Sequence, residues 1–167
     1  MPYNSVGGQL DGIETKADTI DTIIDELVTR AIPKVARKVY TFNATAVAPY
    51  TIFTVTGAVK VKLYAICTTG LTPAVAGATV SLGIVGTVVQ FIAATLAADL
   101  LTGEIWCDAT PTTLVEADAT AGLAKVVIGD GADIIIDVAV QAITSGVIEF
   151  MCEFEPITSN GNVVAVV

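Results

Sequence analysis

Apolar residues recur every three or four positions over residues 6–31, in steps of 4, 3, 4, 3, 4, 3 and 4. This spacing is the heptad repeat of a coiled coil, in which apolar side chains occupy positions a and d. We call these positions the heptad seam; they are Val6, Leu10, Ile13, Ala17, Ile20, Ile24, Leu27 and Ala31. The pattern predicts that the unit formed by residues 1–33 holds a coiled-coil-like helix, which begins at Val6 or a few residues later, is stopped by Pro33 and serves for oligomerisation or anchoring.

The residue types in the seam favour three chains over two. Isoleucine stands at position a (Ile24) and at position d (Ile13 and Ile20), which shifts the preference from dimers to trimers or tetramers. Lys16 at position g and Asp21 at position e of the next heptad suit an ion pair between chains. We therefore expect a homotrimer. The alternative is a single amphipathic helix that lies on its own domain.

From residue 37 onward the apolar period changes to two, as in half-buried strands. The clearest example is residues 147–155, with an inner row of Ile148, Phe150, Cys152 and Phe154. Further strands are expected over residues 38–43, 51–56, 59–64, 79–85, 88–94, 103–107, 123–128, 134–141 and 163–167. Short strands without a helical pattern between them predict a mainly β chain. An N-terminal helix is followed, over residues 34–167, by an antiparallel β-sandwich whose expected topology is a jelly roll.

Turn residues mark the expected breaks between strands. Thr69-Gly70 and Ser145-Gly146 are two of these predicted breaks. The alanine-rich residues 93–101 suit a single helical turn. Residues 163–167 form an apolar strand without charge, and an uncovered edge of this kind aggregates. We expect it to pair within the sandwich or with a neighbouring subunit.

The composition indicates that much surface is buried between subunits. Hydrophobic residues make up 53% of the chain, charged residues only 15%, and the mean hydropathy is +0.74. A membrane-spanning helix needs roughly 18–20 consecutive apolar residues, whereas the apolar stretch 75–98 is broken by glycines and rich in threonine and valine. The N-terminus shows no basic region followed by an apolar core, so we expect neither a secretory signal nor a membrane partner.

The net charge of −9 is unevenly distributed. Residues 30–38 carry no acid and hold what we call the basic cluster, namely Arg30, Lys34, Arg37 and Lys38. In a trimer the basic cluster would form a collar able to dock onto an acidic protein surface. The alternative is that these residues complement the negative helix end and a solvated linker. The acidic remainder argues against nucleic acid as a partner, because phosphate neutralisation dominates such binding.

No motif indicates catalysis, and we expect no enzyme activity, no cofactor and no bound metal. Residues 129–133 place Asp130 and Asp133 in a glycine-rich turn, but the later ligands of a calcium loop are missing, so a plain hairpin turn is expected. Glu149, Glu153 and Glu155 share one strand face. Paired carboxylates could hydrolyse a glycoside, but a solvated strand face is the simpler interpretation.

The remaining reactive residue types suit a core better than a site. Cys67, Cys107 and Cys152 are widely spaced, and the chain has no histidine and no CxxC pair. We interpret them as small buried hydrophobes of a protein that folds in a reducing compartment. Trp106 lies in an expected strand, so we place it in the core rather than in a sugar-binding platform.

Three segments carry a resemblance to a known class of proteins: FTVTGAVKV (53–61), ATVSLG (78–83) and GEIWCD (103–108). With the heptad helix and the sandwich rich in Thr, Ala, Val and Gly, the chain resembles bacteriophage virion structural proteins, more narrowly the small trimeric head-decoration and head-fibre proteins. The resemblance implies a homotrimer located in the virion and bound to the major capsid protein or another virion protein. It transfers no site residues.

We therefore expect a non-enzymatic, homotrimeric capsid decoration, cement or head-fibre protein that binds the shell multivalently. The first alternative is a receptor-binding or glycan-binding fibre tip, which would call for exposed aromatic side chains in the loops of the sandwich. The second alternative, from another class, is a carboxylate-based hydrolase.

Overall fold

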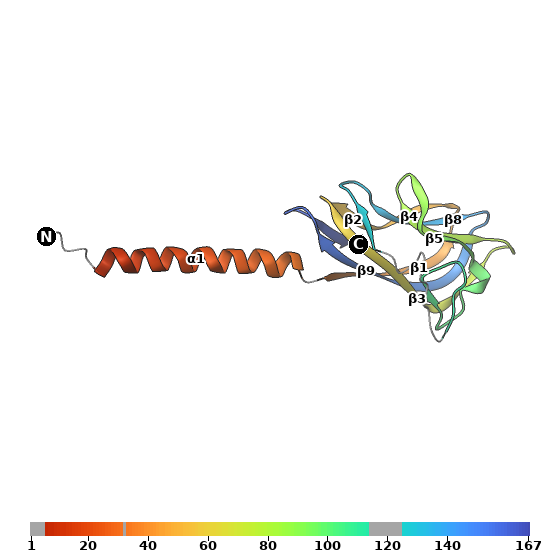
Figure 1. Cartoon of the computed structure of the whole chain (residues 1–167). Coiled ribbons are helices and arrows are strands. Elements are labelled where there is room, and N and C mark those ends of the chain that lie inside the picture. The colour runs from red at the N-terminus through yellow and green to blue at the C-terminus, as the bar shows by residue number, and fades with distance from the viewer. Residues whose placement is uncertain (1–5, 32, 114–124) are drawn as a thin grey trace. The chain divides into compact units, whose positions relative to one another are not determined.

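The computed structural model describes residues 6–31, 33–113 and 125–167, with only the backbone described for residues 6–11 and 26–31. The chain divides into two compact units, Met1–Pro33 and Lys34–Val167. The first unit holds helix α1 (Val6–Ala31), and the second holds two β-sheets that face one another (Figure 1). Within the described residues, no helix is both long enough and apolar enough to span a membrane.

Helix α1 covers the residues over which the heptad pattern predicted it. It ends two residues before Pro33, because proline disfavours the helical conformation in the residue that precedes it. Thr19 donates a hydrogen bond to the carbonyl oxygen of Thr15 at 2.8 Å, and Thr22 donates one to that of Asp18 at 2.9 Å. This bonding to the preceding turn satisfies threonine hydroxyls on the helix face that lies away from the heptad seam.

Ten strands and one short 3-10 helix make up the described part of the second unit. In chain order they are β1 (Lys34–Thr45), β2 (Ala48–Thr56), β3 (Val59–Pro73), β4 (Thr79–Ile84), β5 (Thr87–Leu96), η1 (Ala97–Asp99), β6 (Ile105–Trp106), β7 (Val126–Ile128), β8 (Ile134–Ala139), β9 (Ile143–Pro156) and β10 (Asn162–Ala165). One sheet has the order β1-β9-β3-β6, with β7 also paired to β3, and the other has the order β10-β2-β8-β4-β5. Every pairing is antiparallel, so the predicted mainly β sandwich is confirmed.

The strand pairing is that of a jelly roll. β1 pairs with β9, β2 with β8, β3 with both β6 and β7, and β4 with β5. The same pairs would form in one long hairpin with β1–β4 in one arm and β5–β9 in the other. In a jelly roll this hairpin is wound so that successive strand pairs belong alternately to the two sheets. β6 and β7 pair with successive parts of the β3 edge that lies away from β9, and they share the place of a single strand. The expected topology is therefore present.

The C-terminal segment is covered within the chain. Val163 on β10 lies opposite Val55 on β2, and the backbone N–H of Val166 donates to the carbonyl of Ile52 at 3.0 Å. The Lys38 ammonium group donates to the carbonyl of Val166 at 2.5 Å. Of the two covers expected for this apolar segment, the structure shows pairing within the sandwich.

The hydrophobic core lies between the two sheets. The inner row predicted for β9 is buried, and it consists of Ile148, Phe150, Cys152 and Phe154. Trp106 is also fully buried, with its indole N–H donating to the Thr95 hydroxyl at 2.9 Å and its ring centroid 6.3 Å from that of Phe150. Its expected place in the core is confirmed. Truncating a buried aromatic side chain to alanine costs about 3–5 kcal/mol, so the burial of Trp106 contributes substantially to the stability of the sandwich.

Strands β3 and β9 run through two of the predicted breaks. Thr69-Gly70 lies within β3 and Ser145-Gly146 within β9, where the pairing shifts register on both sides of Thr69. Gly146 has a φ of 134°, and a Cβ at this position would lie 2.4 Å from Leu71 Cδ2 and 2.9 Å from Leu71 Cα. The glycine therefore bends a continuing strand around a packed leucine rather than ending the strand.

The β8–β9 turn departs from the predicted alternation at Val140. The strand predicted over residues 134–141 alternates Ile134, Ile136, Val138 and Val140 on one face, but β8 ends at Ala139 and Val140 is 64% exposed. Its φ is 67°, and the backbone N–H of Gln141 donates to the carbonyl of Ala139 at 2.8 Å. That hydrogen bond closes a three-residue γ-turn, in which a β-branched residue at positive φ is strained.

The substitution Gly146→Ala should destabilise the sandwich by about 1–3 kcal/mol, because alanine tolerates neither the backbone conformation nor the contact with Leu71. Urea unfolding followed by tryptophan fluorescence measures the change. Gly129→Ala is the matched control, since a Cβ there meets no atom within 4 Å. Equal stability of the two variants would contradict this account of the bend.

Candidate functional site

The heptad seam is the first candidate surface. Within the single chain, Ile13, Ile20 and Ile24 are 62%, 55% and 49% exposed, and Ala17 is exposed as well. The remaining seam positions belong to α1 or its ends, but their side chains lie outside the described residues: Val6, Leu10, Leu27 and Ala31. Exposed isoleucines in one line on a helix form a surface suited to association with other apolar side chains.

The basic cluster lies mainly on a strand. Because β1 begins at Lys34 and not at residue 38, Lys34, Arg37 and Lys38 occupy strand positions and not the solvated linker of the alternative interpretation. The side chain of Arg30 lies outside the described residues. Alternate strand side chains point to opposite faces, so Lys34 and Lys38 lie on one face of β1 and Arg37 on the other. Arg37 forms an ion pair with Glu149 at 3.2 Å. A docking role for the cluster stays a prediction.

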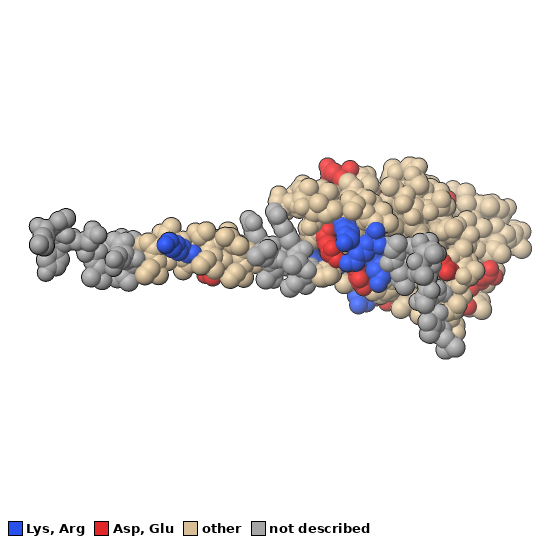
Figure 2. All heavy atoms as spheres, in the orientation of Figure 1, with Lys and Arg blue, Asp and Glu red and all other residues tan. Residues whose placement is uncertain are grey.

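The outer face of β9 and β3 carries a ladder of paired charges. Lys60 Nζ lies 3.6 Å from Glu155 Oε2, and Lys125 forms an ion pair with the other oxygen of the same carboxylate. The Tyr64 hydroxyl donates to Glu153 Oε1 at 3.2 Å. Figure 2 shows Lys and Arg gathered beside Asp and Glu on one face of the sandwich. Exposed pairs of this kind contribute about 0–1 kcal/mol each, so the ladder organises the face more than it stabilises the fold.

The electrostatics of this ladder do not favour acid catalysis by Glu155. The hydrogen bond from Lys125, together with the positive charges of Lys125 and Lys60, holds the pKa of the Glu155 carboxyl below its usual value. A catalytic acid in glycoside hydrolysis needs the opposite, a carboxyl whose pKa is raised. Burial, and then the neighbouring carboxylate of Glu153, raise the pKa of the Tyr64 hydroxyl, so that group stays protonated.

Asp130 and Asp133 fasten two turns of the sandwich together. Asp133 Oδ1 accepts a hydrogen bond from the backbone N–H of Val55 at 2.8 Å, and Asp130 Oδ1 accepts one from that of Gly57 at 2.9 Å. The β7–β8 turn is thereby held against the end of β2 and the β2–β3 turn. Both carboxylates accept hydrogen bonds from backbone N–H groups. The described residues contain no cluster of three or more potential metal ligands.

The three cysteines are buried, and none of them forms a disulfide. Burial raises the pKa of the Cys67 thiol to about 11 and that of the Cys152 thiol to about 12. A thiol is nucleophilic only as the thiolate, so these two groups are inert near neutral pH. Their interpretation as small buried hydrophobes is confirmed.

Fold and site together define a jelly-roll sandwich that follows a helix with an exposed heptad seam. A chain of the capsid asymmetric unit of cyanophage Pam1 is similar, with a TM-score of 0.50 and 21% sequence identity over 74% of this chain and 84% of that chain. At this identity the similarity shows the fold, and it agrees with the structural resemblance to phage virion proteins expected from the sequence.

A chain of the acid-stable capsid of Helicobacter pylori bacteriophage KHP30 matches over 81% of this chain and 94% of that chain. Its TM-score of 0.36 and identity of 16% are too low to carry an argument. No family model matches this sequence, and no curated protein does.

Replacing Asp133 by alanine should cost about 1–3 kcal/mol, because the backbone N–H of the buried Val55 loses its acceptor. Chemical unfolding of the full chain measures this loss. Asp137→Ala, on the outer face of the same sheet, is the control and should change stability by less. Addition of calcium should leave the unfolding midpoint of the unsubstituted chain unchanged, whereas a clear rise would indicate a metal site at this turn.

The thiols should react with a disulfide reagent at pH 8 only after the chain is unfolded. Since the pKa values of Cys67 and Cys152 are raised in the folded state, their contribution to stability is present below the unfolded thiol pKa of about 8.5. It is lost as the pH rises toward about 11 and about 12, so stability should fall over this range. The variant Cys152→Ala should show a shallower fall, and rapid labelling of the native chain would contradict the assignment.

Proposed function

We propose that this chain is a non-enzymatic structural component of a bacteriophage particle, which forms a homotrimer and decorates or cements the shell or builds a head fibre. The observation that carries the proposal is the combination of a jelly-roll sandwich, shared with a chain of the cyanophage Pam1 capsid asymmetric unit, with a helix whose heptad seam is exposed in the single chain. The first feature supports a place in a virion, and the second supports assembly of copies.

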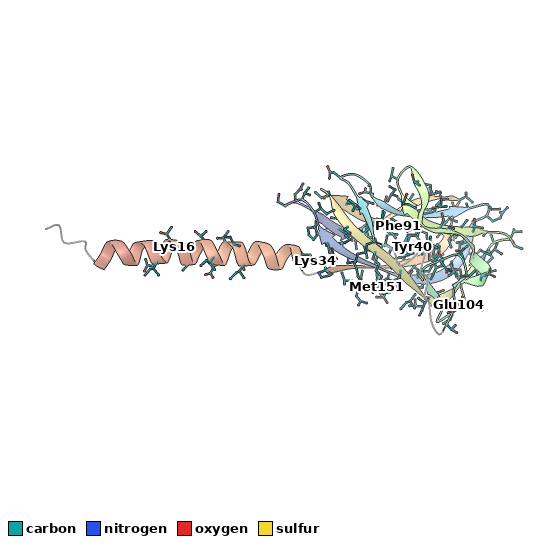
Figure 3. All side chains as sticks on the ribbon, viewed as in Figure 1. Lys16, Lys34, Tyr40, Phe91, Glu104 and Met151 are labelled. Carbon is teal, nitrogen blue, oxygen red and sulfur yellow. The ribbon has the colours of Figure 1, made fainter. Side chains whose placement is uncertain are left out.

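The chemistry of the heptad seam supports the proposed trimer. Fully burying one isoleucine side chain is worth about 1.5–3 kcal/mol, and each helix offers at least three half-exposed isoleucines. Association of three helices covers this surface on every chain, with isoleucine at both a and d positions favouring more than two strands. Lys16 and Asp21 then stand where an ion pair between chains can form; Figure 3 shows Lys16 on α1.

A trimer suits a decoration protein because it multiplies modest contacts. Three sandwiches tied by one bundle bind a shell with an avidity that exceeds any single contact by a factor of 10²–10⁴ when the sites match the spacing. The sandwich has its own buried core within Lys34–Val167, so the bundle and the sandwich serve different roles in this proposal.

The aromatic side chains give less support to a glycan-binding fibre tip. Trp106 is fully buried, while Tyr40, Tyr50 and Tyr64 are half-buried. The Tyr50 hydroxyl is engaged by the carbonyl of Ala46 at 2.9 Å. The exposed aromatic platform that sugar binding calls for is therefore not formed by these four residues.

Light scattering on the purified chain should give three times the 17.1 kDa of one chain, and Ile20→Lys should reduce this mass to that of a monomer. The lysine would place three charges in the core of the bundle, where no partner offsets them. Thr19→Lys, one residue away on the outer face of the helix, should leave the trimer intact. A monomeric unsubstituted chain at micromolar concentration would refute the proposed assembly.

The chain should also be present in purified particles of the phage that encodes it, as measured by mass spectrometry after density-gradient purification. Added to particles that lack it, the unsubstituted chain should co-sediment, and the Ile20→Lys variant should bind at least about tenfold more weakly because avidity is lost. Thr19→Lys again serves as the control. Absence of the chain from particles would reject the virion role.

A further inference from the structure

Within the described residues, four connections between strands gather at one end of the sandwich. Because β1 leads away from the point where the chain enters at Lys34, the antiparallel order gathers the β1–β2, β3–β4, β5–β6 and β8–β9 connections at the opposite end. Backbone hydrogen bonds tie these connections together: Ala74 N–H donates to Ala142 at 2.9 Å, and Leu71 N–H donates to Leu100 at 2.9 Å. We call this end of the sandwich the four-turn end.

Each of these connections presents one aliphatic side chain that is more than half exposed. They are Val47, Val75, Leu101 and Val140. Leu101 also lines a shallow depression of about 520 Å³, together with Pro111 and the acidic residues Asp99 and Glu104. The four-turn end thus offers both apolar projections and a recess with an acidic wall.

Val140 is held in a conformation that works against stability. Its φ of 67° lies in the region that β-branched residues avoid, and the γ-turn points the side chain into solvent. Asparagine or glycine would adopt this turn at lower cost. A strained and exposed valine is explained if its side chain makes a contact outside the chain.

The cations of the sandwich are confined to one end, where they lie among carboxylates such as Glu153 and Glu155. The six cations of the sandwich lie on β1, on β3 or just before β7, in each case far from the four-turn end. They are Lys34, Arg37, Lys38, Lys60, Lys62 and Lys125. Asp99 and Glu104 lie in the β5–β6 connection at the four-turn end. Figure 3 shows Lys34 and Glu104 far apart on the sandwich.

This charge pattern selects the kind of partner. The four-turn end of a second copy would bring like charges together, and the predicted helix of another copy is acidic too, with a net charge of −5 over residues 1–29. A surface with apolar hollows and lysine or arginine side chains matches both the aliphatic projections and the acidic recess. A long cationic side chain fits the recess with its apolar stem against Leu101.

We propose that the four-turn end is the docking surface for a different virion protein whose contact region is apolar and rimmed with basic side chains. This inference rests on the proposed function and adds which end of the sandwich makes the contact. Val140 contacts the apolar part of the partner surface, and the recess beside Leu101 receives a basic side chain of the partner.

The test compares Val140→Asn with Val127→Asn in the full chain. Val127 is 63% exposed, as Val140 is 64% exposed, but it lies on β7 away from the four-turn end. Val140→Asn should raise the thermal midpoint by about 2–4 °C because strain is relieved, and it should weaken binding to phage particles that lack the chain by about tenfold. Val127→Asn should leave that binding unchanged.

A second variant tests the charge. Asp99→Lys should weaken binding to the same particles, and the unsubstituted chain should bind less as salt increases. If the unsubstituted chain binds and Val140→Asn binds equally well, this inference is overturned while the proposed function stands. Loss of binding in Lys34→Glu but not in Val140→Asn would assign docking to the basic cluster instead. A chain that binds no particles at all overturns the proposed function and this inference with it.

Discussion

The backbone pairing of strand β9 is the interaction on which the sandwich depends. Strand β9 is hydrogen-bonded to β1 along one edge, from Ile143 to Phe154, and to β3 along the other edge, from Ile143 to Pro156. Its inner side chains fill the space between the sheets, and its outer glutamates meet the cations of both neighbours. Because β9 is supplied by the last quarter of the chain, neither the core nor the charged face is complete before the two ends of the jelly roll have met.

Winding the chain this way gives the sandwich two unlike ends. At the end where β1 begins, carboxylates of the β7–β8 turn hold backbone groups of β2 and the β2–β3 turn. The cations of the second unit lie at this end on β1 and β3 and just before β7. At the four-turn end, aliphatic side chains and acidic residues lie together. These unlike ends agree with the proposal that the sandwich docks onto a partner protein through the four-turn end, while its other end receives the chain from the segment that holds α1.

The residues that were candidates for catalysis or ligand binding instead take part in interactions that stabilise the sandwich. Asp133 accepts from the backbone of Val55, Glu155 is paired with two lysines, and the Cys152 thiol has its pKa raised by burial. Trp106 donates to Thr95 inside the core. Each of these groups is buried or held by an interaction of the folded chain, as the proposed structural role expects.

The periodic features of this protein were determined by the sequence alone, because the side-chain period of a helix or a strand is a local property. The heptad helix, the inner row of β9 and the mainly β class followed from it. The start of β1 at Lys34, the passage of β9 through Gly146 and the outward turn at Val140 did not, since each depends on a strand or side chain distant in sequence. The seam was likewise visible in the sequence, whereas the four-turn end was not. Its four connections are spread from residue 46 to residue 142, and only the winding of the jelly roll brings them together.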